Sequence, residues 1–331
     1  MLERKTIFIT GASGFVGSHI VEMALQQQFK VYAMVRKSSS MEYLENVDVV
    51  YGDVNDEQSL LSIFSAFKNT NVTIDYIIHA AALTKSNSKR DFFKTNYSGT
   101  ENLISALKKS NLSTNKIIFI SSLAASGPAK ANSQIQLSDQ NPITLYGQSK
   151  LKAEQLIKNC GLPYIIIRPT AVYGPREKDL YTVFKFVDKN INPVLGTHKQ
   201  DLTFVYVGDL VRLILRATLS EIENEIYFVS DGRIYDKNAL STAIAKALNK
   251  KPLHIKVPLG IVRIAAFISQ YVSAISGKVS PLNIEKYNEL VAESWNCEMT
   301  KTVHHFQFQA KHDLESGVKK TIEWYKQNKW I

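Results

Sequence analysis

The sequence predicts an α/β fold: a doubly wound parallel sheet with a smaller, mainly helical C-terminal region. Short apolar runs alternate with longer helical patterns through the first two thirds of the 331 residues, as in consecutive strand–helix–strand units. The apolar runs are continuous rather than alternating, which is typical of strands covered on both faces. After Pro169 this rhythm loosens, and turns are indicated at Gly174-Pro175, Asn192-Pro193 and Lys251-Pro252.

Each element is predicted from its local pattern. Six apolar, β-branched runs predict strands over Thr6 to Thr10, Val31 to Val35, Val47 to Tyr51, Tyr76 to His79, Lys116 to Ser121 and Tyr164 to Arg168. Helical periodicity between them predicts helices over Phe15 to Gln27, Gln58 to Phe67, Asn96 to Lys108 and Tyr146 to Asn159. Further along, we expect a strand over Thr203 to Asp209, a capped helix over Leu210 to Leu219 and a strand over Ile226 to Val229.

Composition excludes several classes of protein. With 45% hydrophobic and 21% charged residues, the chain is neither disordered nor collagen-like. Its two cysteines, Cys160 and Cys297, are too few for a disulfide framework and too far apart in sequence for a close zinc-binding pair, so no metal site is expected. Sparse cysteines and the lack of an apolar leader favour a cytoplasmic protein.

Charge and apolar patterning name no macromolecular partner. Lys and Arg number 40 against 30 Asp and Glu, a net charge of +10, but the surplus is scattered and no nucleic-acid partner is expected. The most apolar helical segment, Pro258 to Ile268, lies in a stretch interrupted by Arg263 and Gln270, so no membrane span is expected. Core packing or an oligomer face is the favoured interpretation of this segment. A lid over an apolar substrate or a membrane-surface contact is the alternative.

Three glycines follow the first predicted strand, where the chain is expected to turn into a helix. Glycine allows a sharp turn and lets the backbone approach a pyrophosphate, which then binds the free N–H groups and positive dipole end of the helix. Strand, turn and helix are all predicted in the required order. The sequence therefore predicts a dinucleotide-binding Rossmann region with cofactor contacts from Gly11, Ser13, Gly14, Phe15, Val16 and Gly17.

The spacing of these glycines, T-G-x-x-G-x-x-G, resembles that of the short-chain dehydrogenase/reductase superfamily. The residue after the second predicted strand is Arg36, where an NAD enzyme usually carries an acid. A guanidinium at this place suits the 2′-phosphate of NADP, so we expect NADP, with NAD as the alternative. The other interpretation of Arg36 is a solvent-facing side chain in a basic loop.

Two further segments resemble cofactor-binding parts of the superfamily. The pair Asp53 and Val54 follows the third predicted strand and is expected to contact adenine, although Asp53 suits a helix N-cap equally well. After the fourth strand, small side chains would let the cofactor's ribose lie close to the backbone at Ala80, Ala81 and Ala82. The preceding residue, His79, is expected to be a structural histidine and is assigned no catalytic role.

Tyr146 and Lys150 lie four residues apart, hence on one face of a predicted helix. Because a free tyrosine titrates at about 10, a tyrosine that moves protons at neutral pH needs a neighbouring cation, which Lys150 can supply. Ser121 and Ser122 end the fifth predicted strand, at the sheet edge where ligands bind. In the resembling superfamily a serine five residues before a glycine orients the reacting oxygen. Gly127 makes that residue Ser122, with Ser121 as the register alternative.

Later segments indicate which branch of the superfamily the chain resembles. Arg168 to Arg176 resembles the R-P-x-x-V-Y-G-P segment of the extended, or atypical, branch, and this implies that Pro169 and Val172 line the nicotinamide. Phe204 to Leu210 resembles its later F-V-x-V-x-D-L segment. The chain thus resembles the NAD-dependent epimerase/dehydratase family, nearest to hydroxysteroid dehydrogenases and dihydroflavonol reductases. The catalytic residues that the resemblance implies are Ser122, Tyr146, Lys150 and Asn96.

The resemblance also implies the domain organisation. Residues 1–172 are expected to form the cofactor-binding domain, with 203–230 returning to it, and residues 173–202 and 231–331 the substrate-binding domain. A homodimer is expected through the helices that start near Asn96 and Tyr146. The expected partner is a small-molecule substrate.

Within the extended branch, the residues around Ser122 favour one reaction. Dehydratases carry an Asp-Glu pair after the serine, where this chain has Leu123 and Ala124. Epimerases often carry Tyr before the glycine, where Ser126 indicates an apolar pocket wall. With Arg36, these features favour an NADP(H)-dependent ketone reductase or secondary-alcohol dehydrogenase.

In the implied mechanism, Tyr146 transfers the proton, Ser122 orients the substrate oxygen, and Lys150 lowers the tyrosine pKa while holding the nicotinamide ribose. An NAD-dependent sugar-nucleotide epimerase is the alternative. A non-catalytic NADP-sensing or RNA-binding protein is the remote alternative.

Overall fold

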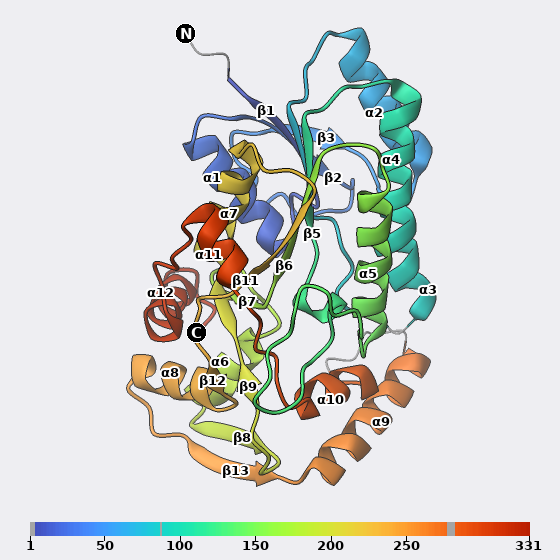
Figure 1. Cartoon of the computed structure of the whole chain (residues 1–331). Helices are drawn as coiled ribbons and strands as arrows, with labels where there is room; N and C mark the ends of the chain where they lie inside the picture. Colours follow the sequence, from blue (N-terminus) through green and yellow to red (C-terminus); the bar gives the residue numbers. More distant parts are fainter. Residues whose placement is uncertain (1–3, 87, 277–281) are drawn as a thin grey trace.

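A seven-stranded parallel sheet forms the centre of the molecule (Figure 1). The structure is a computed structural model that describes residues 4–86, 88–276 and 282–331. The strand order is β11-β6-β5-β4-β1-β2-β3, so the chain runs outward from β1 in one direction, returns, and continues in the other. This order is that of a doubly wound sheet and confirms the predicted fold class.

The first part of the chain builds most of this sheet. Its strands are β1 (Thr6–Thr10), β2 (Lys30–Val35), β3 (Asp48–Tyr51), β4 (Tyr76–His79), β5 (Lys116–Ile120), β6 (Tyr164–Pro169) and β7 (Ala171–Tyr173). Its helices are α1 (Phe15–Gln26), α2 (Glu57–Asn69), α3 (Lys89–Phe92), a π-helical turn η1 (Phe93–Ser98), α4 (Gly99–Ser110), a 3₁₀ turn η2 (Leu123–Ala125) and α5 (Leu145–Lys158).

The second part alternates between the sheet and a smaller region. Its strands are β8 (Ile191–Leu195), β9 (Asp201–Leu202), β10 (Phe204–Tyr206), β11 (Glu225–Val229), β12 (Tyr235–Asp236) and β13 (Leu253–Val257). Its helices are α6 (Tyr181–Asp188), α7 (Val207–Leu219), α8 (Ala239–Leu248), α9 (Leu259–Ser276), α10 (Ile284–Val291), α11 (Thr300–Phe306) and α12 (Leu314–Gln327).

Helices cover both faces of the sheet, so its strands are apolar on both sides. On one face, Ile20 and Val21 of α1 and Leu210 and Ile214 of α7 belong to one buried apolar cluster. On the other face, α2, α4 and α5 contribute Phe64, Leu103 and Ile157 to a second cluster. These two layers leave the carboxyl ends of the strands as the open edge of the sheet.

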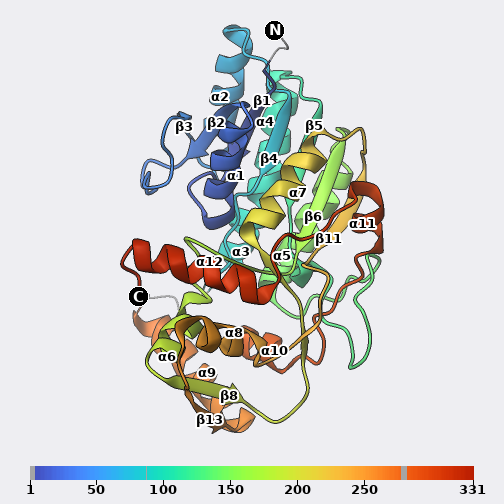
Figure 2. The ribbon, with the colours of Figure 1, turned by 90° about the vertical axis from the view of Figure 1, so that its left-hand side faces the viewer.

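The smaller region lies beyond that edge (Figure 2). It contains α6, α8, α9 and α10, together with the parallel pair β8–β13. The chain crosses back to the sheet through α7 and β11, because β11 pairs with β6 as the last strand. Residues far apart in sequence therefore meet where the strands end.

The largest differences from the boundaries that the sequence predicts fall in two places. The segment expected to be a strand over Thr203 to Asp209 is a strand only over Phe204–Tyr206, and α7 already starts at Val207 without a side-chain cap. The helix expected from Asn96 begins as the π-helical turn η1 and becomes α-helical at Gly99. Local π-helical turns are frequent where a side chain is redirected toward a functional site.

Candidate active site

The glycine-rich turn after β1 has no room for side chains. Gly11 has a φ of +68°, and a Cβ there would lie 2.6 Å from the backbone nitrogen of Ala81. A Cβ on Gly17 would lie 2.0 Å from the carbonyl oxygen of Gly11. Gly14 is the N-cap of α1, and no side chain caps the helix. Its first N–H groups are therefore available to an anion, as the pyrophosphate of a dinucleotide requires.

The segment Ala80 to Ala82 follows β4 and lies directly against this turn. Its position depends on His79, whose two ring nitrogens bond the hydroxyls of Thr10 at 2.6 Å and Thr100 at 2.9 Å. The Thr10 hydroxyl also accepts a hydrogen bond from the backbone of Ala81 at 3.2 Å. Burial lowers the pKa of His79 to about 3, so this histidine is neutral at physiological pH. Its contacts are structural and place the alanines beside the glycine turn.

The three predicted cofactor residues after β2 and β3 differ in their surroundings. Arg36 is exposed at the end of β2, at the same edge as the glycine turn. Val54 is buried, and its carbonyl accepts a hydrogen bond from Asn102. Asp53 accepts a hydrogen bond from the backbone of Asn55, whereas the N-cap of α2 is Asp56. The alternative interpretation of Asp53 as a helix cap is therefore wrong, because the helix starts three residues later than that role needs.

The two serines after β5 point to different partners. Ser121 is buried and its hydroxyl bonds Glu154 at 2.5 Å. Ser122 is the partly exposed one, and a side-chain hydrogen bond joins it to Tyr146. Because successive side chains alternate in direction, only one serine of the pair can face the open edge. The structure places Ser122, rather than the register alternative Ser121, beside the tyrosine.

The side chain of Ser126 faces the protein interior. Its side chain is buried and accepts a hydrogen bond from Arg168 at 2.8 Å. Arg168 in turn forms a bidentate pair with Glu154, at 2.9 and 2.6 Å. The expectation that Ser126 marks an apolar pocket wall is therefore wrong, since this position belongs to a buried ionic network below the site.

Tyr146 stands in the first turn of α5, whose N-cap is Thr144. Burial raises its pKa to about 12; the hydrogen bond from Ser122 acts to lower that pKa, and the charge of Glu289 acts to raise it. The phenol is therefore a protonated group held at the open edge. Lys150 is not among the groups that shift the pKa of Tyr146. The expectation that Lys150 lowers the tyrosine pKa is therefore not confirmed.

Lys150 lies one helical turn beyond Tyr146 and is almost fully buried. Its ammonium group donates a hydrogen bond to the carbonyl of Ile120 at 2.6 Å and lies 4.1 Å from the ring centre of Phe119. Burial lowers the pKa of Lys150 to about 7. The group is thus held at the end of β5 and titrates near neutral pH.

Asn96 joins the loop after β4 to α5. Its side chain makes no described hydrogen bond to Tyr146 or Lys150. Its side-chain oxygen accepts from the backbone of Leu83 at 2.7 Å, and its amide donates to the carbonyl of Leu83 at 3.0 Å. The same amide donates to Ser149, next to Lys150, at 2.9 Å. The π-helical turn aims Asn96 at these partners, so it positions the loop after β4 against α5.

The predicted cofactor residues Pro169 and Val172 lie at and just after the end of β6. Pro169 is the last residue of β6 and is buried, and Val172 lies half-buried in β7. Val172 pairs with Val205 of β10. The predicted residues from β1, β4, β5 and β6 thus share one edge of the sheet.

Two acidic residues near Tyr146 were not predicted from the sequence. Glu285 of α10 accepts a hydrogen bond from the backbone of Leu145 at 2.6 Å, and its pKa is raised by burial. Glu289, one turn further along α10, exerts the charge effect on Tyr146. They lie about 140 residues beyond α5 in the sequence and carry no motif, so no local signal could have identified them.

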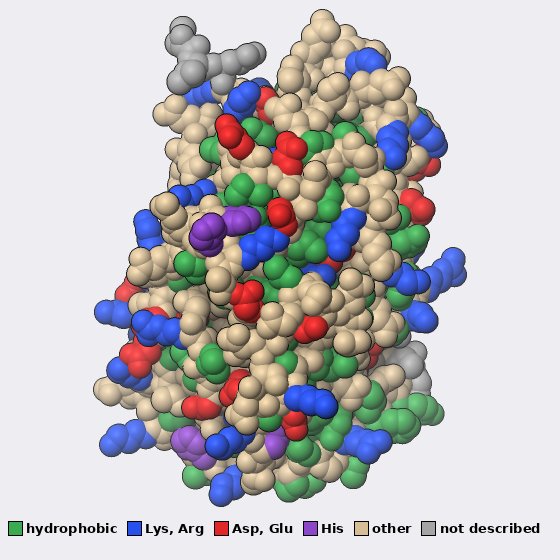
Figure 3. All heavy atoms as spheres, in the orientation of Figure 1, with side chains coloured by type: hydrophobic (Ala, Val, Ile, Leu, Met, Phe, Trp, Pro, Cys, Tyr) green, Lys and Arg blue, Asp and Glu red, His purple; other side chains and the backbone are tan. Residues whose placement is uncertain are grey.

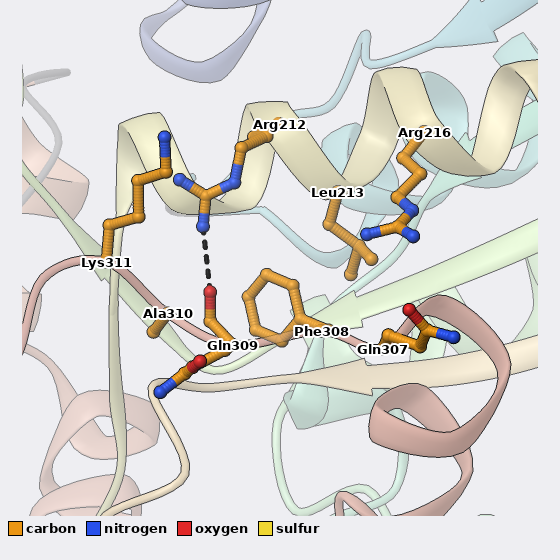
Figure 4. A pocket seen from close by; sticks show the side chains of 8 residues that line it. All are labelled: Arg212, Leu213, Arg216, Gln307, Phe308, Gln309, Ala310 and Lys311. Carbon is orange, nitrogen blue, oxygen red and sulfur yellow. Dashed lines mark hydrogen bonds between the residues drawn. The ribbon is translucent and has the colours of Figure 1, made fainter.

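A separate hollow of about 590 Å³ lies outside this site. It is formed by α7 and the segment between α11 and α12, and Figure 4 shows Arg212, Arg216 and Lys311 around the ring of Phe308. Arg212 is already bound to Asp209 and to the carbonyl of Gln309. None of the predicted site residues lines it.

Two kinds of feature are lacking within the described residues. No cluster of His, Cys, Asp and Glu in that part of the chain could hold a metal ion. No helix there is long and apolar enough to cross a membrane.

Comparisons with known proteins identify related sequences and folds. The N-acetyl-alpha-D-glucosaminyl-diphospho-ditrans,octacis-undecaprenol 4-epimerase of Escherichia coli O157:H7 is 27% identical, over 96% of this chain and 94% of its own. The ceramide reductase of Caulobacter vibrioides is 24% identical, over 99% and 96%. The structure of Thermus thermophilus UDP-glucose 4-epimerase in complex with NAD has a TM-score of 0.77 at 21% identity, covering 97% of this chain and 99% of that one.

The family is established by a longer sequence pattern than any single motif. The sequence model of the NAD dependent epimerase/dehydratase family matches residues 7–230, from β1 through β11. This range includes the glycine turn, Ser122, Tyr146 and Lys150. The chain therefore belongs to the NAD dependent epimerase/dehydratase family.

Proposed function

We propose that this protein is an NAD-dependent epimerase acting on a sugar that is joined to a diphosphate, as in a sugar nucleotide or a polyprenyl-diphosphate sugar. The observation that carries the proposal is the convergence of Ser122, Tyr146 and Lys150 at the edge that also carries the glycine turn. Relatives named as 4-epimerases of an undecaprenol-linked sugar and of UDP-glucose support this reaction over ketone reduction.

When bound, NAD would supply the hydride acceptor and donor for such a reaction. The first N–H groups of α1 would bind its pyrophosphate, and the chain would approach it closely at Gly11 and Gly17. Tyr146 would donate or accept the proton at the substrate oxygen, which the Ser122 hydroxyl would orient. Lys150, held by the Ile120 carbonyl, would provide a group that changes charge near neutral pH next to that oxygen.

Dehydration is disfavoured by the residues that follow Ser122. Leu123 and Ala124 form the 3₁₀ turn η2 and are buried. Neither can remove a proton from carbon or protonate a leaving hydroxyl. Among the described residues, the titratable group whose charge acts on Tyr146 is Glu289 of α10, and Glu289 is paired with Lys286. Its neighbour Glu285 accepts a hydrogen bond from the backbone of Leu145 at the start of α5.

A second candidate is an NADP(H)-dependent ketone reductase. It is favoured by the exposed Arg36 at the end of β2 and by the relative named as a ceramide reductase. Its support is narrower than that of the epimerase, because the argument from Ser126 no longer holds. The two-domain division, a homodimer and a cytoplasmic location stay predictions on either function.

The nucleotide carried by the freshly purified protein separates the two candidates. An epimerase regenerates its cofactor in every turnover, so we expect about one NAD per chain after denaturation and mass spectrometry. An empty site, or NADP that exchanges freely, would contradict the epimerase and support the reductase. An Arg36→Ala variant that loses NADP but keeps NAD would show that this side chain selects the 2′-phosphate.

Substitution of the two neighbouring serines tests the assignment of the site. We expect Tyr146→Phe and Ser122→Ala to keep the nucleotide and lower turnover of UDP-glucose or UDP-N-acetylglucosamine by about a hundredfold to ten-thousandfold, since each removes a group at the reacting oxygen. Ser121→Ala is the matched control, because its hydroxyl faces Glu154. Equal loss of turnover in both serine variants, or normal turnover in Tyr146→Phe, would contradict the assignment.

A further inference from the structure

The helix α9 exposes most of its apolar side chains. Val262 and Ala266 face inward and are buried. The outward residues are between 55% and 67% exposed and recur every three or four positions along the helix, which forms the α9 stripe: Ile261, Ile264, Phe267, Ile268, Tyr271 and Val272. From the sequence, core packing or an oligomer face is the favoured interpretation of Pro258 to Ile268; core packing is wrong for this face, and the oligomer face stays a prediction. An exposed apolar stripe of this length marks a binding surface.

The strand β13 extends the stripe. Leu253 and Ile255 are 69% and 43% exposed, and the chain passes from β13 into α9 through Pro258. Hydrophobic side chains gather at the lower right of Figure 3, where Figure 1 places α9. The apolar surface is thus continuous along one end of the smaller region.

The charged residues on β13 and α9 themselves are all basic. No Asp or Glu occurs in the sequence between Asp236 and Glu285. The same stretch of sequence contains seven basic residues: Lys237, Lys246, Lys250, Lys251, Lys256, Arg263 and Lys278. Lys246 and Lys250 pair with Glu315 and Asp188, and Lys278 lies outside the described residues. Of the seven, Lys256 and Arg263 are exposed on β13 and α9 themselves. An apolar face whose own charged residues are cations is complementary to an interface that is apolar inside and anionic at its surface.

The stripe is connected to the candidate active site through α10. The side chain of Gln270 accepts a hydrogen bond from the backbone of Ile284, at the start of α10. In α10, Glu285 bonds the backbone next to Tyr146 and Glu289 acts on its hydroxyl. A partner that contacts α9 would therefore lie close to the edge of the candidate active site.

We propose that the α9 stripe and β13 dock this protein onto an anionic lipid bilayer, with α9 lying in the headgroup region. A second copy of the chain fits this surface less well, because a symmetric interface would bring the same Lys and Arg residues of both copies together. The proposed docking does not depend on which reaction the protein catalyses. One consequence rests on the proposed function: the diphosphate-linked sugar would be one carried by a membrane lipid.

Vesicle binding by the full-length protein tests the proposal. The probes are vesicles of phosphatidylcholine alone and vesicles containing about one-third phosphatidylglycerol. We expect salt-sensitive binding that is about tenfold or more tighter to the anionic vesicles. The double variant Ile264→Gln/Phe267→Gln and the double variant Lys256→Gln/Arg263→Gln should each weaken it by about tenfold.

The matched control replaces exposed apolar residues outside the surface. Leu219 and Val303 are 50% and 48% exposed, so Leu219→Gln/Val303→Gln removes similar side chains without touching α9. We expect this control to bind vesicles like the unmodified protein. Equal binding by the control and by Ile264→Gln/Phe267→Gln, or no preference for anionic vesicles, would overturn the proposal. A dimer that the α9 variant dissociates, with no vesicle binding, would assign the surface to a second copy instead.

Activity separates this proposal from the proposed function. We expect the α9 variants to keep turnover of a soluble sugar nucleotide while losing turnover of the same sugar on a polyprenyl diphosphate in vesicles. Vesicle binding without any epimerase activity would refute the proposed function and leave the docking surface intact. Equal turnover of the vesicle-bound substrate by the α9 variant and the control would refute the link between docking and substrate.

Discussion

The central sheet and the α9 surface use apolar residues in opposite ways. In the sheet, every strand from β1 to β6 except β3 is largely buried, and even the charges beneath the site, Arg168 and Glu154, are fully buried and paired. On α9, six large apolar side chains are exposed, and the one charged residue of the helix, Arg263, is exposed among them. The side chains of the sheet pack against one another, whereas the apolar side chains of the α9 stripe remain accessible to solvent.

This difference separates the two kinds of function proposed for the molecule. Chemistry at the open edge of the sheet needs groups held to within fractions of an ångström, which a fully packed support provides. Docking needs an accessible surface, and exposed side chains on α9 can be changed without disturbing the sheet. The first two predictions below test that contrast by pairing a change at a buried position with a change at an exposed one, and the third tests a buried group by itself.

The largest effect is expected from the buried ion pair under the site. We expect Arg168→Met to lower the free energy of unfolding by about 3–5 kcal/mol, because Glu154 would keep a buried charge without its partner. Lys246→Met, which breaks the exposed pair between Lys246 and Glu315, should cost less than about 1 kcal/mol. Urea unfolding of both variants measures this. Similar losses in the two would contradict the contrast.

An intermediate effect is expected from adding one methyl group in each region. Gly17→Ala places a Cβ against the backbone of Gly11, which cannot move aside, and should destabilise the protein by about 1–3 kcal/mol and abolish nucleotide binding. Gly260→Ala in α9 has nothing within 4 Å of the new Cβ and should be neutral or stabilising by up to about 1 kcal/mol. Thermal unfolding with and without nucleotide measures the stability and the nucleotide binding of both variants. A tolerated Gly17→Ala would refute the close turn.

Over the first pH unit below neutral, the smallest effect is expected from the titration of His79. Because the pKa of His79 is lowered to about 3, the folded protein keeps this ring neutral while the unfolded chain takes up a proton below its ordinary pKa of 6.5. Stability should therefore fall as pH drops from 6.5 toward 3, approaching about 1.4 kcal/mol per pH unit from this residue. Imidazole NMR should find His79 still neutral at pH 5. A protonated His79 in the folded state at that pH would refute its burial between Thr10 and Thr100.

Much of the fold follows from local pattern. The six predicted strands of the first part each overlap a strand of the sheet, because continuous apolar, β-branched runs have no other stable place than a doubly covered sheet. The boundary of α7 was mispredicted since Val207 and Gly208 fit a strand pattern as well as a helix. The position of the glycine turn at the edge of the sheet could be predicted from the order of strand, turn and helix along the chain.

The chemical content of the site was also encoded locally, but its arrangement was not. Spacing within one helix puts Tyr146 and Lys150 on the same face, and a motif offset singles out Ser122 from Ser121. The direction of the tyrosine pKa, the burial of Ser126 on Arg168 and the approach of Glu289 all depend on contacts with other elements.

The sequence by itself therefore determined the fold class, the family and the residue types at the sheet edge, because each depends on short-range periodicity and spacing. Only the tertiary structure decided which side chains stay in water. The apolar pattern of Pro258 to Ile268 is the same for a core helix and a surface helix. What leaves Phe267 at 67% exposure is the absence of any neighbour over that face among the described residues, and neighbours are set by long-range packing.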